Sequence, residues 1–134
     1  KQLVNGNIKV SDLPDFWNSK MEEYLGVTPP NDTKGVLQDI HWSMGAIGYF
    51  PTYTLGNLYA AQLYAAALAD DPTIPSKIAK GEFRVLLDWM RSHIHVHGSK
   101  LKPAELITQA TGKEPSSNEF IQYLTSKYTK IYNL

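Results

Sequence analysis

The sequence predicts an all-α protein, a bundle of roughly six helices around a central buried helix at Leu55–Ala69. Apolar residues recur at spacings of three and four, and glycine or proline stands where these stripes begin or end. No stretch supports a strand as strongly as these patterns support helices. A chain of 134 residues with 43% hydrophobic residues can bury one modest core, so we expect a single helical region over residues 1–134.

Charge and composition exclude several classes of function. Thirteen Lys and Arg residues balance thirteen Asp and Glu residues, so we expect neither nucleic acid nor membrane as a partner. The absence of cysteine excludes disulfides, thiolate metal sites and a cysteine nucleophile, and it favours a cytoplasmic location. The chain begins at Lys1 and not at methionine, so we expect it to be part of a longer protein.

The first helix should begin at Ser11 or Asp12, carry Pro14 in its first turn and end at Gly26. Its apolar stripe consists of Phe16, Trp17, Met21, Tyr24 and Leu25. The prolines and turn formers of residues 27–34 predict a rigid connector.

Residues 35–44 keep helical spacing, which places His41 at the border of the apolar face. Asp39 falls on another side of such a helix, so spacing does not predict a simple pair between Asp39 and His41. His41 is then either a half-buried histidine satisfied by a backbone carbonyl or a functional residue.

Gly45 and Gly48 weaken a helix and allow either a sharp bend or a close approach of the backbone to a ligand. A new helix should begin near Pro51. Tyr49 and Tyr53 would lie at the N-terminal end of this helix, where backbone N–H groups and the helix dipole favour negative charge. Their hydroxyls could act on a developing oxyanion. The alternative is that both are core residues whose hydroxyls find an ordinary acceptor.

A further helix is expected from Pro75 to His97, with a weak point at Gly81. On a helix only His93 and His97 of the His93-x-His95-x-His97 segment have the i, i+4 spacing of a metal pair. We favour a role for these histidines as cations at a helix C-terminus over metal binding.

The last two helices have clear boundary signals. One should run from Pro103 to Gly112, and the other should follow a capping box from Ser116 to Glu119 and continue through Tyr132.

The segments GVLQDIHW at residues 35–42 and GYFPTYTLG at residues 48–56 resemble paired motifs of the carboxypeptidase Taq (M32) family of zinc metallopeptidases. The segments FWNSKMEEYLG, His95-x-His97-Gly98, Glu105-Leu106 and YLTSKYTKIY also look like the C-terminal portion of such enzymes. The resemblance covers essentially the whole chain. It implies a mostly helical enzyme that releases single residues from peptide C-termini by metal-activated water.

The resemblance also implies where the metal is held. In this family HExxH and a downstream glutamate bind zinc, and no HExxH occurs in this sequence. We therefore expect the chain to be the C-terminal portion of a metallocarboxypeptidase catalytic domain. Zinc belongs to the full-length enzyme, its ligands lie outside this chain, and the chain alone should bind none and be inactive.

By the same resemblance, Tyr49 and Tyr53 are catalytic donors to the oxyanion, and His41, Gln38 and Asp39 bind substrate. The expected partners are peptide substrates and the remainder of the same enzyme, with a homodimer left open. The alternative is a stand-alone, non-catalytic helical module for packing or interaction. Such a module should expose no large apolar patch.

Overall fold

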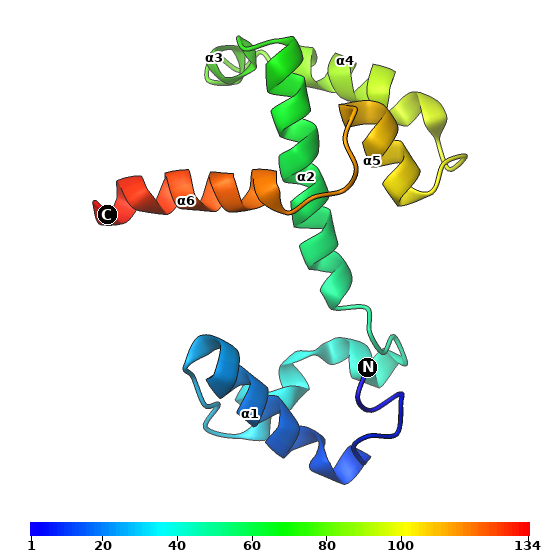
Figure 1. Ribbon diagram of the computed structural model, residues 1–134, viewed down its shortest axis with the longest axis vertical. Helices are drawn as coiled ribbons and strands as arrows, with labels where there is room; N and C mark the ends of the chain where they lie inside the picture. Colours follow the sequence, from blue (N-terminus) through cyan, green and yellow to red (C-terminus); the bar gives the residue numbers. More distant parts are fainter. The chain divides into compact units, whose positions relative to one another are not determined.

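The computed structural model describes residues 1–134 and confirms the all-α class (Figure 1). It contains no strand. The six α-helices are α1 (Leu13–Leu25), α2 (Pro51–Asp70), α3 (Ile74–Ile78), α4 (Arg84–His93), α5 (Pro103–Thr111) and α6 (Asn118–Tyr132). The five 3₁₀-helices are η1 (Val10–Asp12), η2 (Asp32–Lys34), η3 (Val36–Gln38), η4 (Ile40–Met44) and η5 (His95–His97). The chain forms two compact units, Lys1–Thr52 and Tyr53–Leu134.

Helix α1 begins and ends as predicted. Asp12 occupies the N-cap position, Pro14 lies in the first turn, and Gly26 ends the helix with a φ of 67°. Glycine adopts this left-handed conformation without the steric cost of a Cβ atom. In the first unit α1 contacts η3, so the segment that carries the candidate site packs on this helix.

Residues 36–44 form two 3₁₀-helices, and the continuous helix that their spacing suggests is wrong. Asp39 separates η3 from η4 with a φ of −81° and a ψ of 87°. Its Oδ1 accepts a hydrogen bond of 3.1 Å from the backbone N–H of His41 and so caps η4. A short acidic side chain that bonds the neighbouring backbone offers the chain an alternative to the α-helix.

The predicted glycine bend is confirmed. Gly45 ends η4 with a φ of 71°, and Gly48 follows with a φ of 84°. Both values lie in the region that only glycine enters at low cost. This bend leads the chain to α2, which begins at Pro51 as expected.

The second unit is arranged around α2, with α3, α4, α5 and α6 placed along it (Figure 1). Its core cluster contains Ala67, Ile74 and Trp89, against which partly buried side chains of α2, α3 and α4 pack. Burial within α2 is nevertheless confined to Gln62 and Ala67. The helix is central but not buried throughout, because the other helices of this unit cover only part of its surface.

The helix expected from Pro75 to His97 is two helices, α3 and α4, followed by η5. Gly81 lies between α3 and α4 with a φ of 81°, which an α-helix cannot contain.

The predicted capping box before α6 is also wrong. The hydroxyl of Ser116 accepts a bond of 3.0 Å from the N–H of Asn118, and Glu119 lies 3.6 Å from the Nζ of Lys113.

Asp71 fixes the turn between α2 and α3. Its Oδ1 accepts hydrogen bonds from the hydroxyl of Thr73 and from the backbone N–H of Thr73, the latter at 2.9 Å. Lys77 Nζ lies 3.1 Å from Oδ2. These contacts, the Thr73 hydroxyl foremost, lower the pKa of Asp71 from 3.8 to about 2. The turn therefore keeps its charged acceptor at neutral and mildly acidic pH.

Gln62 joins α2 to the loop between α5 and α6. The residue is 2% exposed, and its side-chain amide nitrogen donates to the carbonyl of Glu114 at 2.9 Å. Its Oε1 accepts from the backbone N–H of Ser116 at 3.1 Å. A glutamine amide has both donors and an acceptor, so one side chain satisfies backbone groups of both kinds.

We expect Gln62→Leu to destabilise the second unit. The apolar side chain fits the volume but leaves the Glu114 carbonyl and the Ser116 N–H without this partner, at a cost of about 1–3 kcal/mol. Urea unfolding of the chain measures the change. Gln109→Leu, at an exposed position of α5, is the control and should change the free energy of unfolding by less than about 0.5 kcal/mol. Equal effects of the two variants would contradict this role of Gln62.

Candidate functional site

The site begins with a buried pair between Asp39 and His41. Asp39 Oδ1 lies 2.7 Å from Nδ1 of His41, and each residue is 9% exposed. This pair is the one that helical spacing does not predict. The cap that Asp39 forms on η4 turns its carboxylate toward the imidazole, so that one oxygen meets both the backbone N–H and the ring of His41.

Two aromatic rings contact the imidazole. The ring centroids of His41 and Tyr49 are 5.0 Å apart with the planes tilted by 32°, and Phe50 meets His41 edge-on at 5.7 Å. Tyr49 and Phe50 are about half exposed. Sequence reasoning missed Phe50, although it stands beside Tyr49 in the motif. The structure thus brings together His41, Asp39 and Tyr49, with Phe50 in addition.

Gln38 and Tyr53 are the two other predicted site residues. Gln38 is exposed, and its amide donates to the backbone carbonyl of Thr33 at 2.6 Å, which ties it to the preceding turn. Tyr53 lies in the first turn of α2 and is 54% exposed. Backbone N–H groups at this end of a helix have no intrahelical acceptor, so the position suits an anion.

The His93, His95 and His97 segment forms no metal centre. Across all 134 residues, no three His, Cys, Asp or Glu side chains are arranged to hold a metal ion. The chain leaves the helix at Ile94, whose φ of −125° and ψ of −61° separate His93 from His97. The residues present therefore do not fit a catalytic zinc site.

His93 has a packing role instead. Its ring stacks on Trp89 with centroids 4.3 Å apart, and its Nδ1 lies 2.9 Å from the Trp89 carbonyl oxygen. The indole N–H of Trp89 donates to Asp70 at 2.7 Å. These contacts fasten α4 to the end of α2.

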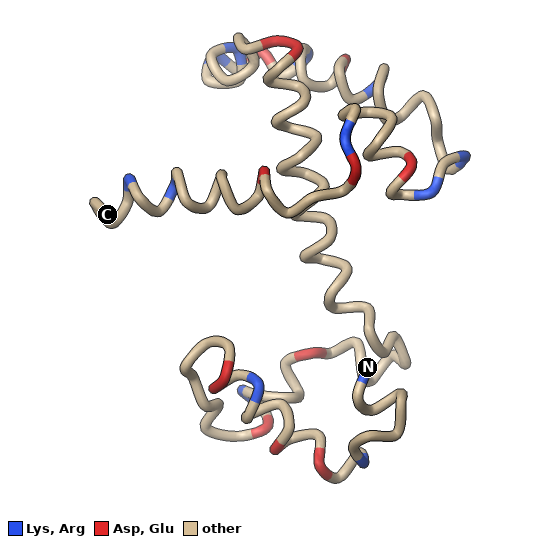
Figure 2. The backbone as a smooth tube through the Cα atoms, viewed as in Figure 1, with Lys and Arg blue, Asp and Glu red and all other residues tan.

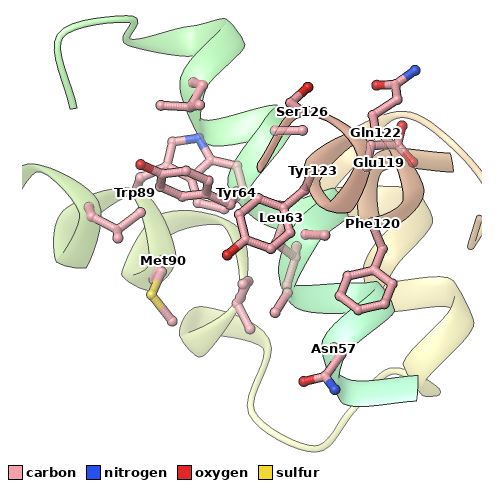
Figure 3. A pocket seen from close by; sticks show the side chains of 16 residues that line it. Asn57, Leu63, Tyr64, Trp89, Met90, Glu119, Phe120, Gln122, Tyr123 and Ser126 are labelled. Carbon is pink, nitrogen blue, oxygen red and sulfur yellow. The ribbon is translucent and has the colours of Figure 1, made fainter. Parts of the chain in front are cut away.

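The second unit also contains an apolar groove of about 770 Å³ between α2, α4 and α6 (Figure 3). Leu63, Tyr64, Trp89, Met90 and Phe120 are among its lining residues. Charged residues of both signs are scattered over the chain, and α2 carries none before Asp70 (Figure 2). The groove therefore offers hydrophobic contact and little charge.

The sequence profile of the carboxypeptidase Taq (M32) metallopeptidases matches residues 1–128. The chain belongs to this family.

Individual relatives agree with this assignment. Carboxypeptidase 1 of Bacillus subtilis is 42% identical over 134 residues, which are 100% of this chain and 27% of that protein. Thermostable carboxypeptidase 1 of Thermus thermophilus is 45% identical over 130 residues, 97% of this chain and 26% of that protein. The crystal structure of the M32 carboxypeptidase from Deinococcus radiodurans R1 matches with a TM-score of 0.92 and 39% identity, over 99% of this chain and 27% of that one. The chain spans 26% to 27% of the length of these relatives.

Gly35 holds the site segment against its neighbours, and we expect Gly35→Ala to destabilise the first unit. A Cβ atom there would lie 3.2 Å from the Asn31 carbonyl oxygen, 3.2 Å from Pro29 Cβ and 3.3 Å from Asn18 Oδ1. Such overpacking costs about 1–3 kcal/mol. Thermal unfolding of the chain measures it.

Gly56→Ala is the matched control. Its Cβ would meet no atom within 4 Å, and Gly56 lies inside α2. Alanine favours a helix interior over glycine by about 0.5–1 kcal/mol, so this variant should be neutral or stabilised. A Gly35→Ala variant as stable as the wild type would show that the close approach at Gly35 does not affect the stability of the first unit.

Proposed function

We propose that the whole protein is a zinc-dependent metallocarboxypeptidase that releases single amino acids from peptide C-termini in the cytoplasm. This chain is its C-terminal part and supplies residues that bind the substrate and stabilise the oxyanion. The observation that carries the proposal is the buried Asp39–His41 pair packed against Tyr49, inside the segment where the family motifs lie.

The proposed roles follow from the chemistry of each side chain. The imidazole of His41 can donate or accept a hydrogen bond and suits the polar end of a peptide. The phenols of Tyr49 and Tyr53 are neutral donors, and a donor aimed at a forming oxyanion lowers the barrier more than it aids substrate binding. Gln38 lies in the same segment, and its amide oxygen can accept a hydrogen bond while its nitrogen donates to Thr33.

The metal belongs to the rest of the protein in this proposal, since these residues hold no set of ligands for it. We expect the whole protein to bind stoichiometric metal and to release C-terminal residues from peptides, and this chain alone to do neither. Elemental analysis and a C-terminal release assay on both samples test this. Peptide release by the purified chain, or a whole protein that lacks metal and activity, would overturn the proposal.

The remainder of the same polypeptide is the proposed occupant of the apolar groove in the second unit. The groove and exposed residues such as Leu55 and Tyr64 form apolar surface of the kind that marks an interaction site. A stand-alone module would not be expected to expose it, so the groove counts against that alternative. Binding of an apolar dye should be strong in the chain and weak in the whole protein. Equal, weak binding would favour the stand-alone module.

Phenylalanine substitutions in the whole protein should identify the oxyanion donor. Loss of a hydroxyl that contacts the oxyanion lowers kcat by about 10²–10³-fold with little change in KM. We expect this result for Tyr49→Phe or Tyr53→Phe, and steady-state kinetics on peptide substrates will show which. Tyr132→Phe, at an exposed position near the end of α6, is the control. If kcat survives both substitutions, these tyrosines are not oxyanion donors.

A further inference from the structure

We propose that Asp39 is a positioning residue for His41 and does not itself contact the peptide. The inference rests on the proposed function, in which His41 binds substrate. It changes the role that the resemblance implies for Asp39, because the carboxylate is already committed to His41 in the structure.

Asp39 and His41 are buried as a hydrogen-bonded pair. The side chains of Asp39 and His41 are each 11% exposed, and their ring nitrogen and carboxylate oxygen lie 2.7 Å apart. A buried carboxylate is costly unless it is hydrogen-bonded to a suitable partner. Turning Asp39 toward a peptide would break this bond and leave His41 without its acceptor at Nδ1.

The backbone of η4 holds the carboxylate of Asp39 in place. The backbone N–H of His41 donates to the same Oδ1 at 3.1 Å, as an N-cap bond of η4. The cap fixes the carboxylate, and the carboxylate in turn fixes the ring. Tyr49 and Phe50 pack against the imidazole at centroid distances of 5.0 and 5.7 Å and restrict its rotation.

The bond at Nδ1 determines the hydrogen-bonding role of Nε2. With Nδ1–H donating to Asp39, a neutral ring has its acceptor at Nε2, and a protonated ring has a second donor there. In both states the carboxylate holds Nδ1, so Nε2 is the nitrogen through which His41 would bind the peptide in the proposed function. A carboxylate that orients a histidine through Nδ1 acts through that residue, and its loss costs activity even though it touches no substrate.

The kinetic test is a double-mutant cycle in the whole protein with Asp39→Asn, His41→Gln and the double variant. Asparagine is a good N-cap residue, so the η4 cap persists while the charge is lost. We expect each single variant to lower kcat/KM by about ten- to a hundredfold, and the double variant to be no worse than His41→Gln alone. Losses that multiply would show that Asp39 acts on the peptide independently of His41 and would overturn the inference.

A spectroscopic test separates this inference from the proposed function. In ¹⁵N spectra of His41, the wild-type protein should carry its proton on Nδ1. Asp39→Asn should weaken this preference and shift the population toward the Nε2–H tautomer, because a neutral amide oxygen accepts from Nδ1–H less strongly than a carboxylate. Asp39→Ser, which keeps a capping oxygen but no charge, should give the same shift if the asparagine variant folds poorly. Asp32→Asn, at an exposed position of η2, is the control and should change neither spectrum nor kinetics.

The two failures are distinguishable. An unchanged His41 tautomer in both Asp39 variants overturns the positioning role, whatever the activity. An unchanged kcat/KM in His41→Gln overturns the proposed role of His41 in substrate binding, whatever its tautomer.

Discussion

A polar group that loses water on folding is stabilised by a protein partner, and three buried polar side chains meet this constraint within the two units. Six apolar residues are buried, and three polar residues, Asp39, His41 and Gln62, are buried with them. Polar contacts therefore join segments of the chain in addition to the apolar core. Gln62 binds the loop between α5 and α6 to α2, and Asp39 determines how the backbone enters η4.

The same constraint couples fold to chemistry in the first unit. The bond that ends η3 and begins η4 comes from the carboxylate oxygen that also meets the imidazole of His41. A change that freed Asp39 from its cap would therefore alter both the local backbone and the orientation of the ring. The local backbone and the proposed substrate binding thus both depend on Oδ1 of Asp39. Close packing around Gly35 holds the segment that carries Asp39 against its neighbours.

Local signals predicted the fold class and most helix ends. Asp12, Pro14 and Gly26 bound α1, and Pro103 and Gly112 bound α5, because caps and left-handed glycines act over a few residues. The motif segment also pointed to His41 and Tyr49. The Asp39–His41 pair could not be predicted, because the spacing argument assumes an α-helix and Asp39 replaces it by a cap. The partners of Gln62 lie 49 to 54 residues along the chain, beyond the reach of any local pattern.

The burial predicted for α2 differs from that observed, and the difference has a physical meaning within the proposed function. The sequence of α2 is apolar on nearly all sides, and such a pattern is typical of a helix that is buried on all sides. Within α2 only Gln62 and Ala67 are buried, while a groove of about 770 Å³ stays open beside this helix, α4 and α6. A chain that spans 26% to 27% of its relatives' length leaves room for the segments that such a surface requires. Because apolar surface on this scale is costly to leave in water, we infer that α2 becomes an interior helix only when the rest of the polypeptide packs on it.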